Sequence, residues 1–160
     1  MRTRGQNAKF LAKLMRKNDS PYWQKAHYGE IDGNIKQLIG IESICFYYFI
    51  MNEPLDVETR DFVASAPDDG TEYNYYSFPK IEFDANNIKN AIKENKKIVQ
   101  IGEKQFIGAD IINIVKVLGN KITFYQVPDA LSRDVFESEE GIAVITPYRQ
   151  AEGGQNETHY

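Results

Sequence analysis

The stretch Ser43-Ile44-Cys45-Phe46-Tyr47-Tyr48-Phe49-Ile50-Met51 is rich in aromatic and β-branched residues. Such residues favour β-strands, and the stretch ends at the turn formers Asn52-Glu53-Pro54. Cys45 is the chain's single cysteine, so no disulfide can form within the chain. A thiol among large apolar side chains is typical of a small core residue and not of a reactive group. The stretch therefore predicts a strand that contributes to the core.

Two further strands and a helix are predicted before this strand. The segments 25–31 and 35–41 flank Asp32-Gly33-Asn34, whose Asp-Gly pair is a strong hairpin signal. A helix over about residues 6–18 is predicted from an apolar stripe at helical spacing. It stops at a cluster of turn formers, residues 18–21. The stripe consists of Phe10, Leu11, Leu14 and Met15.

A second helix-and-strands unit is predicted near the C-terminus. Residues 109–118 read as a helix closed by Gly119-Asn120, and strands follow over 121–127, about 134–138 and 142–146. The two helices align without gaps, Ala8-Lys9-Phe10-Leu11 against Ala109-Asp110-Ile111-Ile112. We therefore expect an α+β fold: one domain, residues 1–150, made of two helix-plus-three-strand halves at about 8–52 and 109–149.

The segment 53–108 is expected to connect the halves. Residues 53–77 look like a loop, and 78–83 like a strand or an extended link. A helix is predicted over about 85–95, with Asp84 as N-cap and Ile88 and Ile92 as apolar anchors. Short strands are expected at 98–101 and 105–107. The polar tail, residues 151–160, is expected to be disordered.

Composition narrows the function classes. The chain has 160 residues, an ordinary apolar content and a net charge of −4, which indicates a folded domain. No run approaches the roughly 20 apolar residues that span a bilayer, and no apolar block follows the basic N-terminus. We therefore expect a cytoplasmic protein without a membrane partner. His27 and His159 have no partner at metal-ligand spacing, and no phosphate-binding loop is present, so neither enzyme activity, a metal nor a cofactor is expected.

The N-terminal segment carries a charge opposite to that of the whole chain. The first 18 residues hold six of the 19 Lys and Arg and none of the 23 Asp and Glu. A basic helix on an acidic body indicates an anionic partner, most commonly nucleic acid. The alternative is a solvated helix face. The candidate DNA-binding residues of this segment are Arg2, Arg4, Lys9, Lys13, Arg16 and Lys17.

A second basic set repeats the same spacing. Lys89, Lys93 and Lys96 step by four and three along the helix predicted over about 85–95. They have the same two interpretations, a contact with phosphates or a solvated face. Glu94 lies among them, and the helix of the second half carries Lys116 but also Asp110.

The element order resembles the bacterial DNA sliding clamp, the processivity factor of replicative polymerases, in its phage and mobile-element form. The resemblance is carried by Met51-Asn52-Glu53-Pro54-Leu55-Asp56, by the helix of residues 109–119 and by the terminal stretch 141–149, which closes in Pro147-Tyr148-Arg149. It implies helices that line a ring and sheets outside it. Because a ring needs six such domains, it also implies a homo-oligomer or partner chains. Ile145, Pro147 and Tyr148 stand where clamps bind partner peptides.

Two functions are therefore predicted. The first is a sliding-clamp-like protein of DNA replication that binds the phosphate backbone non-specifically or joins a clamp-type assembly. The alternative is a protein-interaction module with a clamp-like fold that binds a replication or defence protein and not DNA. Its contact would be the aromatic loop around Tyr73–Tyr76 or the terminal strand.

Overall fold

A computed structural model describes residues 3–16, 26–31, 33–42, 45–65, 75–93, 96–101, 105–126 and 134–147. Within these ranges the helices are α1 (Arg4–Arg16) and α2 (Ala109–Val115), and two 3-10 turns are η2 (Tyr75–Ser77) and η3 (Lys116–Leu118). The strands are β1 (Ala26–Ile31), β2 (Asn34–Glu42), β3 (Cys45–Met51), β4 (Thr59–Ser65), β5 (Lys80–Asp84), β6 (Lys89–Lys93), β7 (Lys96–Ile101), β8 (Gln105–Gly108), β9 (Lys121–Tyr125), β10 (Asp134–Ser138) and β11 (Gly141–Pro147).

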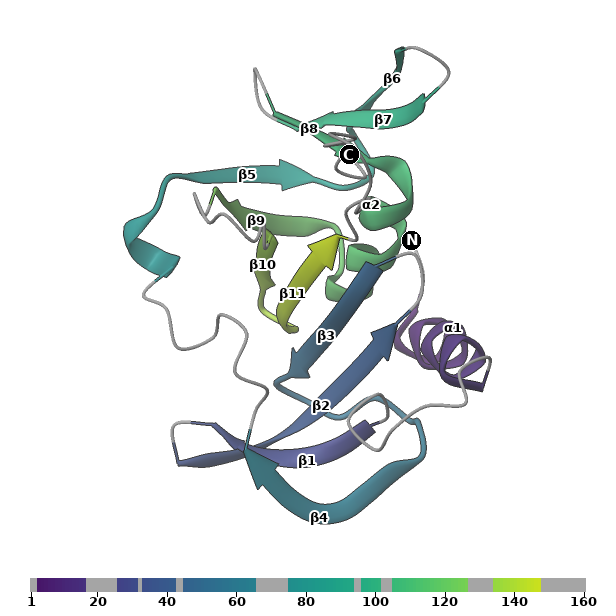
Figure 1. Cartoon of the computed structure of the whole chain (residues 1–160), viewed down its shortest axis with the longest axis vertical. Helices are drawn as coiled ribbons and strands as arrows, with labels where there is room; N and C mark the ends of the chain where they lie inside the picture. Colours follow the sequence, from purple (N-terminus) through teal and green to yellow (C-terminus); the bar gives the residue numbers. More distant parts are fainter. Residues whose placement is uncertain are drawn as a thin grey trace, which may run out of the picture.

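The described strands form a large mixed sheet and a small antiparallel one. The large sheet has eight strands in the order β4-β1-β2-β3-β11-β10-β9-β5, and the small sheet has the order β6-β7-β8. The pair β1–β4 is parallel, and the other neighbours are antiparallel. Figure 1 shows β4 and the small sheet at opposite ends of the molecule. The centre of the large sheet is the β3–β11 pair, in which Phe49 lies opposite Ala143.

The predicted fold class is wrong. The structure is mostly β, and the segment 53–108, expected to connect two helix-plus-three-strand halves, contributes the strands β4 to β8 in the described residues. Two of these, β4 and β5, form the two edges of the large sheet. The clamp-like arrangement is therefore replaced by one continuous sheet with a second sheet beside it. The sequence of β4, Thr-Arg-Asp-Phe-Val-Ala-Ser, does not predict a strand, because it lacks a clear alternation of apolar and polar residues.

The helix predicted over 85–95 is also wrong. Residues 89–93 form β6 and pair with β7. A spacing of four does not separate the two structures, because residues four apart share a face in a helix and in a strand alike. Asp84 does cap the segment, but it caps a turn: its Oδ1 accepts the Asn86 N–H at 2.8 Å and its carbonyl accepts the Asn87 N–H at 2.9 Å.

Several local predictions are confirmed. The N-terminal helix, the three strands after it and the hairpin at residues 32–34 are present, with Ile31 opposite Asn34 and Gly33 at a φ of 81°. The helix of residues 109–118 is α2 extended by η3, and Gly119 ends it with a φ of 96°. The predicted disordered tail, residues 151–160, lies outside the described residues.

The aromatic stretch forms the centre of the sheet and is buried on both faces. Tyr47 and Phe49 belong to the main core under the helices, whereas Tyr48 and Ile50 belong to a cluster on the opposite face. This alternation follows from the two-residue period of a strand. Because both faces are covered, β3 has the continuous apolar sequence of a buried strand.

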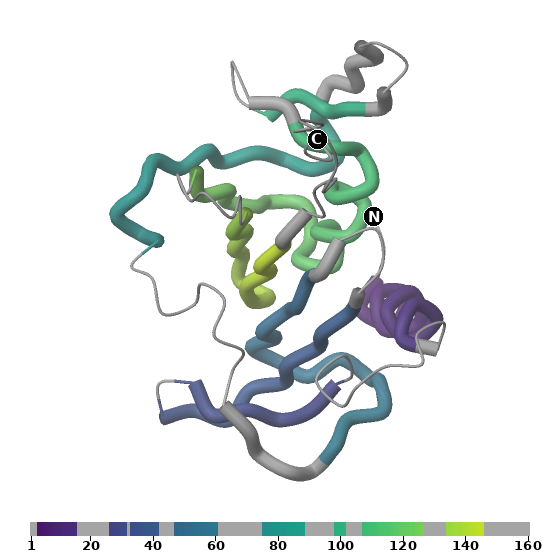
Figure 2. The backbone as a smooth tube through the Cα atoms, in the orientation of Figure 1, coloured from purple at the N-terminus to yellow at the C-terminus, as the bar shows by residue number. Residues whose placement is uncertain are grey.

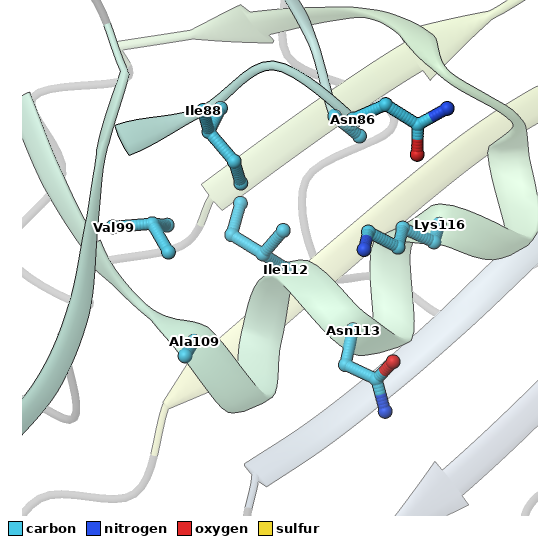
Figure 3. Close-up of a pocket in the computed structure, with 8 residues that line it drawn as sticks. Asn86, Ile88, Val99, Ala109, Ile112, Asn113 and Lys116 are labelled. Carbon is cyan, nitrogen blue, oxygen red and sulfur yellow. The ribbon is translucent and has the colours of Figure 1, made fainter. Parts of the chain in front are cut away.

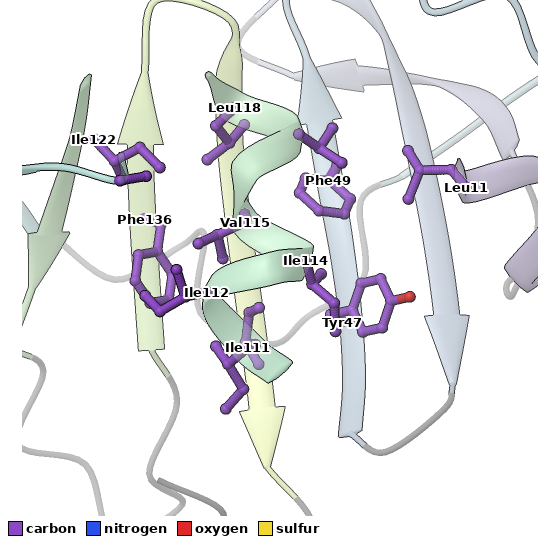
Figure 4. Close-up of a cluster of buried hydrophobic side chains, with 14 of the residues drawn as sticks. Leu11, Tyr47, Phe49, Ile111, Ile112, Ile114, Val115, Leu118, Ile122 and Phe136 are labelled. Carbon is purple, nitrogen blue, oxygen red and sulfur yellow. The ribbon is translucent and has the colours of Figure 1, made fainter. Parts of the chain in front are cut away.

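Both helices pack on the same face of the large sheet. Ile112 and Val115 of α2 and Leu11 of α1 join the main core. Figure 4 shows α2 lying across β3 and its neighbours, with Leu11 approaching the same layer from the side of β2. The tube in Figure 2 traces the same placement, with α1 beside β2 and α2 nearer the small sheet. The core therefore lies between the two helices and the centre of the sheet.

Candidate functional site

The helix α1 turns one face to the core and the other to solvent. Ala8 and Leu11 are 4% and 0% exposed, and Phe10, Leu14 and Met15 pack partly against the core. Lys9 and Lys13 are exposed, and residues four apart are neighbours on a helix surface. Because α1 contains no acidic residue, these two lysines form a small positive surface, the α1 basic face.

The start of α1 is fixed by a reciprocal cap. The Gln6 N–H donates to Thr3 Oγ1 at 3.1 Å, and the Thr3 N–H donates to Gln6 Oε1 at 2.8 Å. This pattern satisfies backbone donors that a helix start leaves unpaired. One turn on, the buried Asn7 donates from Nδ2 to the Val117 carbonyl of η3 at 3.3 Å. The helix is thus held to the body at its first turns, which orients the α1 basic face outward.

Arg4, predicted to bind DNA, instead joins three parts of the body. Its Nη1 pairs with Glu140 Oε2 at 2.8 Å, and its Nη2 donates to the carbonyls of Glu53 and Pro54 at 3.0 Å each. The guanidinium therefore holds α1 to the loop after β3 and to the turn between β10 and β11. In this arrangement its charge is directed at protein groups, and its role is structural.

The loop after β3 is itself held at both ends. Gln37 Nε2 donates to the Leu55 carbonyl at 3.0 Å, and the Leu55 N–H donates to Gln37 Oε1 at 2.8 Å. Asn52 Nδ2 donates to the Glu139 carbonyl at 2.9 Å. The loop whose sequence contributed to the sliding-clamp resemblance thus has a clear structural role: it connects β2, β3 and the β10–β11 turn.

Other predicted DNA-binding residues lie beyond what the structure describes. Arg2 and Lys17 are outside the described residues, and Arg16 is described only as the end of α1. In sequence, Arg16 and Lys17 follow Lys13 by three and four residues, and Arg2 precedes α1.

The second basic set lies on strands rather than on a helix. Lys89 and Lys93 belong to β6 and Lys96 to β7, and the register places Lys93 directly opposite Lys96. The predicted helical stripe is therefore replaced by a lysine-rich hairpin of the small sheet.

Of the predicted partner-binding residues, Ile145 is the one whose side chain the structure describes. Ile145 is 0% exposed and belongs to the main core. The backbone of Pro147 ends β11 opposite Cys45. Tyr148 lies outside the described residues. For an apolar residue such as Ile145, near the end of an apolar strand, the sequence alone does not show whether the side chain points into the core or to the surface.

A tyrosine cluster lies on the face of the sheet opposite the helices. The sequence predicted only an aromatic loop around Tyr73–Tyr76 in this region. Tyr75, Tyr125 and Val135 are buried together. Val135 lies opposite Val144, a member of the cluster on that face. The ring centroids of Tyr75 and Tyr125 are 4.9 Å apart. Tyr73, the first tyrosine of the predicted aromatic loop, is outside the described residues.

The hydroxyls of this cluster converge on one carboxylate. Tyr76 donates to Glu137 Oε2 at 2.9 Å, and Tyr125 donates to Oε1 at 3.0 Å. Tyr75 donates to the Tyr76 oxygen at 2.7 Å. Burial, assisted by the bond to Glu137, raises the pKa of Tyr125 to about 12. Burial, together with the bond to Tyr76 and the charge of Glu137, raises the pKa of Tyr75 well above its usual range. Both phenols are therefore protonated donors at neutral pH.

Asp134 is the buried acidic side chain of the described residues. It is 7% exposed, lies opposite Ile145, and its Oδ2 has no hydrogen-bond partner within the described part of the chain. Removal from water raises the pKa of this carboxyl from 3.8 to about 7. No group of three His, Cys, Asp or Glu suited to a metal ion occurs in the described ranges.

A cavity of about 250 Å³ opens between α2 and the turn after β5. Figure 3 shows Ile88, Val99 and Ile112 pointing toward one another at this cavity, with Lys116 and Asn86 to one side. Ala85, Ala109 and Asn113 complete its wall. This cavity leaves no local signal in the sequence, because its residues come from four separate elements.

Comparison of the chain with models of protein families, with curated proteins and with solved structures found no match in any of the three. In the described residues, no helix is both long enough and apolar enough to cross a bilayer.

Proposed function

We propose that the protein binds DNA non-specifically through the α1 basic face. The observation that carries this proposal is the placement of Lys9 and Lys13. They are exposed one turn apart on a helix without acidic residues, whose other face is packed into the core. Long cationic side chains held on a rigid helix can approach phosphate oxygens without reading the bases. This proposal includes the DNA partner that the sequence predicts, but not the sliding-clamp scaffold, because the structure has one continuous eight-stranded sheet.

The charge distribution supports one orientation of the DNA. All 23 acidic residues follow residue 18, whereas six cations precede it. The remainder carries an excess of negative charge that repels a polyanion, which favours an approach of the duplex toward the N-terminal helix. Arg16 and Lys17 follow Lys13 within about one helical turn in sequence, and Arg2 precedes α1; these three cations would extend the contact. The mechanism is the release of counterions condensed on DNA, which involves no catalysis. The cytoplasmic location predicted from the sequence is part of this proposal.

The test is a charge reversal with a matched control. Fluorescence anisotropy with a labelled random-sequence duplex at low salt would compare wild type with K9E/K13E. We expect the affinity to fall by about tenfold or more, because two phosphate contacts become repulsive. The control is K80E/K121E, which reverses two exposed lysines of β5 and β9 and gives the same net charge.

The control separates a local contact from an effect of net charge. Binding near wild-type strength in K80E/K121E together with loss in K9E/K13E supports the α1 basic face. Equal loss in both variants would show that only the net charge matters. Absence of DNA binding by the wild-type protein at low salt would remove the proposal.

The second candidate function is a protein-interaction module that binds a replication or defence protein and not DNA. It is favoured by Tyr76, which is 60% exposed while its hydroxyl is fixed to Glu137. A large aromatic side chain already held in place is typical of an anchor at a protein interface. Because Tyr76 belongs to the cluster on the sheet face opposite α1, Y76A and K9E/K13E separate the two functions. Loss of a partner in Y76A with DNA binding absent from the wild type would favour this candidate.

A further inference from the structure

We propose that the cavity between α2 and the turn after β5, the Lys116 cavity, binds a small organic monocarboxylate. Its carboxylate would pair with the Lys116 ammonium, and its apolar body would lie on the half-buried Ile88 and Ala109, above Val99 and Ile112. This binding would be independent of DNA binding at α1, because the Lys116 cavity and the α1 basic face share no residue.

The floor of the Lys116 cavity is apolar and firmly held. Val99 of β7 and Ile112 of α2 are each 2% exposed and belong to the main core, and Ile88 packs partly against it. Their side chains meet at the cavity (Figure 3). A floor built from core residues keeps its shape without a ligand, so a ligand does not have to organise it.

The wall carries one cation and no acidic residue. Lys116 is half-buried, and no ion pair joins it to another described residue within 4.0 Å. The other polar wall residues are the amides Asn86 and Asn113. A single ammonium beside an apolar floor matches a ligand with one negative charge. A phosphate, with its larger charge, is usually bound by several donors or by an arginine fork.

The turn that carries Asn86 is fixed on both sides. The Asn86 N–H donates to Asp84 Oδ1 at 2.8 Å, and the neighbouring Ala85 N–H donates to the Asn120 carbonyl at 2.7 Å. The second bond joins this turn to the residue that follows Gly119, just beyond the helical segment that positions Lys116. One backbone hydrogen bond therefore connects the turn that carries Asn86 to the segment that follows Lys116, which holds the backbones on the two sides of the Lys116 cavity together.

The volume limits the size of the ligand. About 250 Å³ lies below the range of about 300–1,000 Å³ found for pockets that hold drug-sized molecules. A ring-sized or short-chain acid fits this space, whereas a nucleotide or a larger cofactor does not. Benzoate is therefore a suitable probe, and benzamide is its neutral counterpart of nearly the same shape.

The experiment is a titration of the full chain, labelled with ¹⁵N, followed by two-dimensional NMR. Benzoate should shift the amide signals of residues 86–88 and 112–116 saturably, with a dissociation constant on the order of 1 mM for so small a ligand. Benzamide should bind at least about tenfold more weakly, since it lacks the charge that Lys116 recognises.

Three variants decide the outcome. K116M should weaken benzoate about tenfold and leave benzamide unchanged, whereas K121M, which removes an exposed lysine outside the cavity, should change neither. A109L keeps Lys116 but fills the cavity, and it should abolish binding of both probes. The inference is overturned if benzoate causes no saturable shifts, if K116M binds it as tightly as wild type, or if A109L leaves its binding intact.

Discussion

At the scale of single residues, the structure contains polar side chains that hold it together and one that opposes folding. Arg4 and Gln37 connect segments through paired hydrogen bonds. Asp134 lies on the core side of β10 with an unpartnered oxygen. Burying a carboxylate without a partner is costly, so the group retains its proton to a higher pH than in water.

Asp134 predicts a pH dependence of stability. Its pKa is raised from 3.8 to about 7 in the folded protein, so the folded state binds more protons than the unfolded state between these values. The contribution of the protonated Asp134 carboxyl to the free energy of unfolding is therefore fully present below about pH 4. It is lost as the pH rises through about 7, where the buried group must ionise. D134N should remove this dependence and unfold at a higher temperature than wild type at pH 8. Melting curves at several pH values test this, and parallel curves for both proteins would contradict it.

Arg4 predicts a stability effect that depends on geometry as well as charge. R4M removes three contacts and should lower the free energy of unfolding by about 1–2 kcal/mol, a modest value because the ion pair is half exposed. R4K keeps the charge but cannot bridge a carboxylate and two carbonyls with one planar group, so it should recover only part of the loss. Urea unfolding measures both. Full recovery in R4K would show that charge alone accounts for the effect.

At the scale of elements, the junction of β3 and β11 depends on one glycine. Gly141 has a φ of 153°, and a Cβ there would overlap the Ile50 carbonyl of β3. Gly33, in the β1–β2 turn, has a φ of 81° but open space around it. G141A should therefore cost about 2 kcal/mol or more, and G33A about 1 kcal/mol. Equal losses of unfolding free energy in the two variants would contradict the close approach of β3 and β11.

The elements that could be predicted from the sequence are those with a strong local signal. The helix α1, the β1–β2 hairpin and β3 have strong local signals: an apolar stripe, an Asp-Gly turn and an aromatic run. The strand β6 was predicted as a helix because the steps between Lys89 and Lys93 and between Ile88 and Ile92 fit either structure. The parallel pairing of β4 with β1 leaves no local signal, since it depends on residues distant in the chain.

The candidate sites also divide into features with a local sequence signal and features that depend on distant residues. Exposure of Lys9 and Lys13 was predictable, because both follow from the helical period of α1. The ion pair between Arg4 and Glu140, which lies 136 residues away, was not predictable from sequence. The Lys116 cavity was not predictable either. Both combine elements whose proximity is set by the sheet order.

At the scale of the whole molecule, the helices and the tyrosine cluster occupy opposite faces of one sheet. The acidic body and the basic N-terminal helix give the protein an uneven charge distribution. A polyanion is therefore repelled by the acidic parts of the body and attracted to α1. The central claim is that phosphate contacts on this helix account for DNA binding.

The salt dependence of DNA affinity tests this claim most directly. Each phosphate contact contributes about 0.9 to the slope of the logarithm of the binding constant against the logarithm of salt concentration. K9Q/K13Q, which removes two contacts without adding negative charge, should therefore reduce the steepness of this negative slope by about 1.8 relative to wild type. An unchanged slope in K9Q/K13Q would contradict the claim, because the contacts would then lie elsewhere on the molecule.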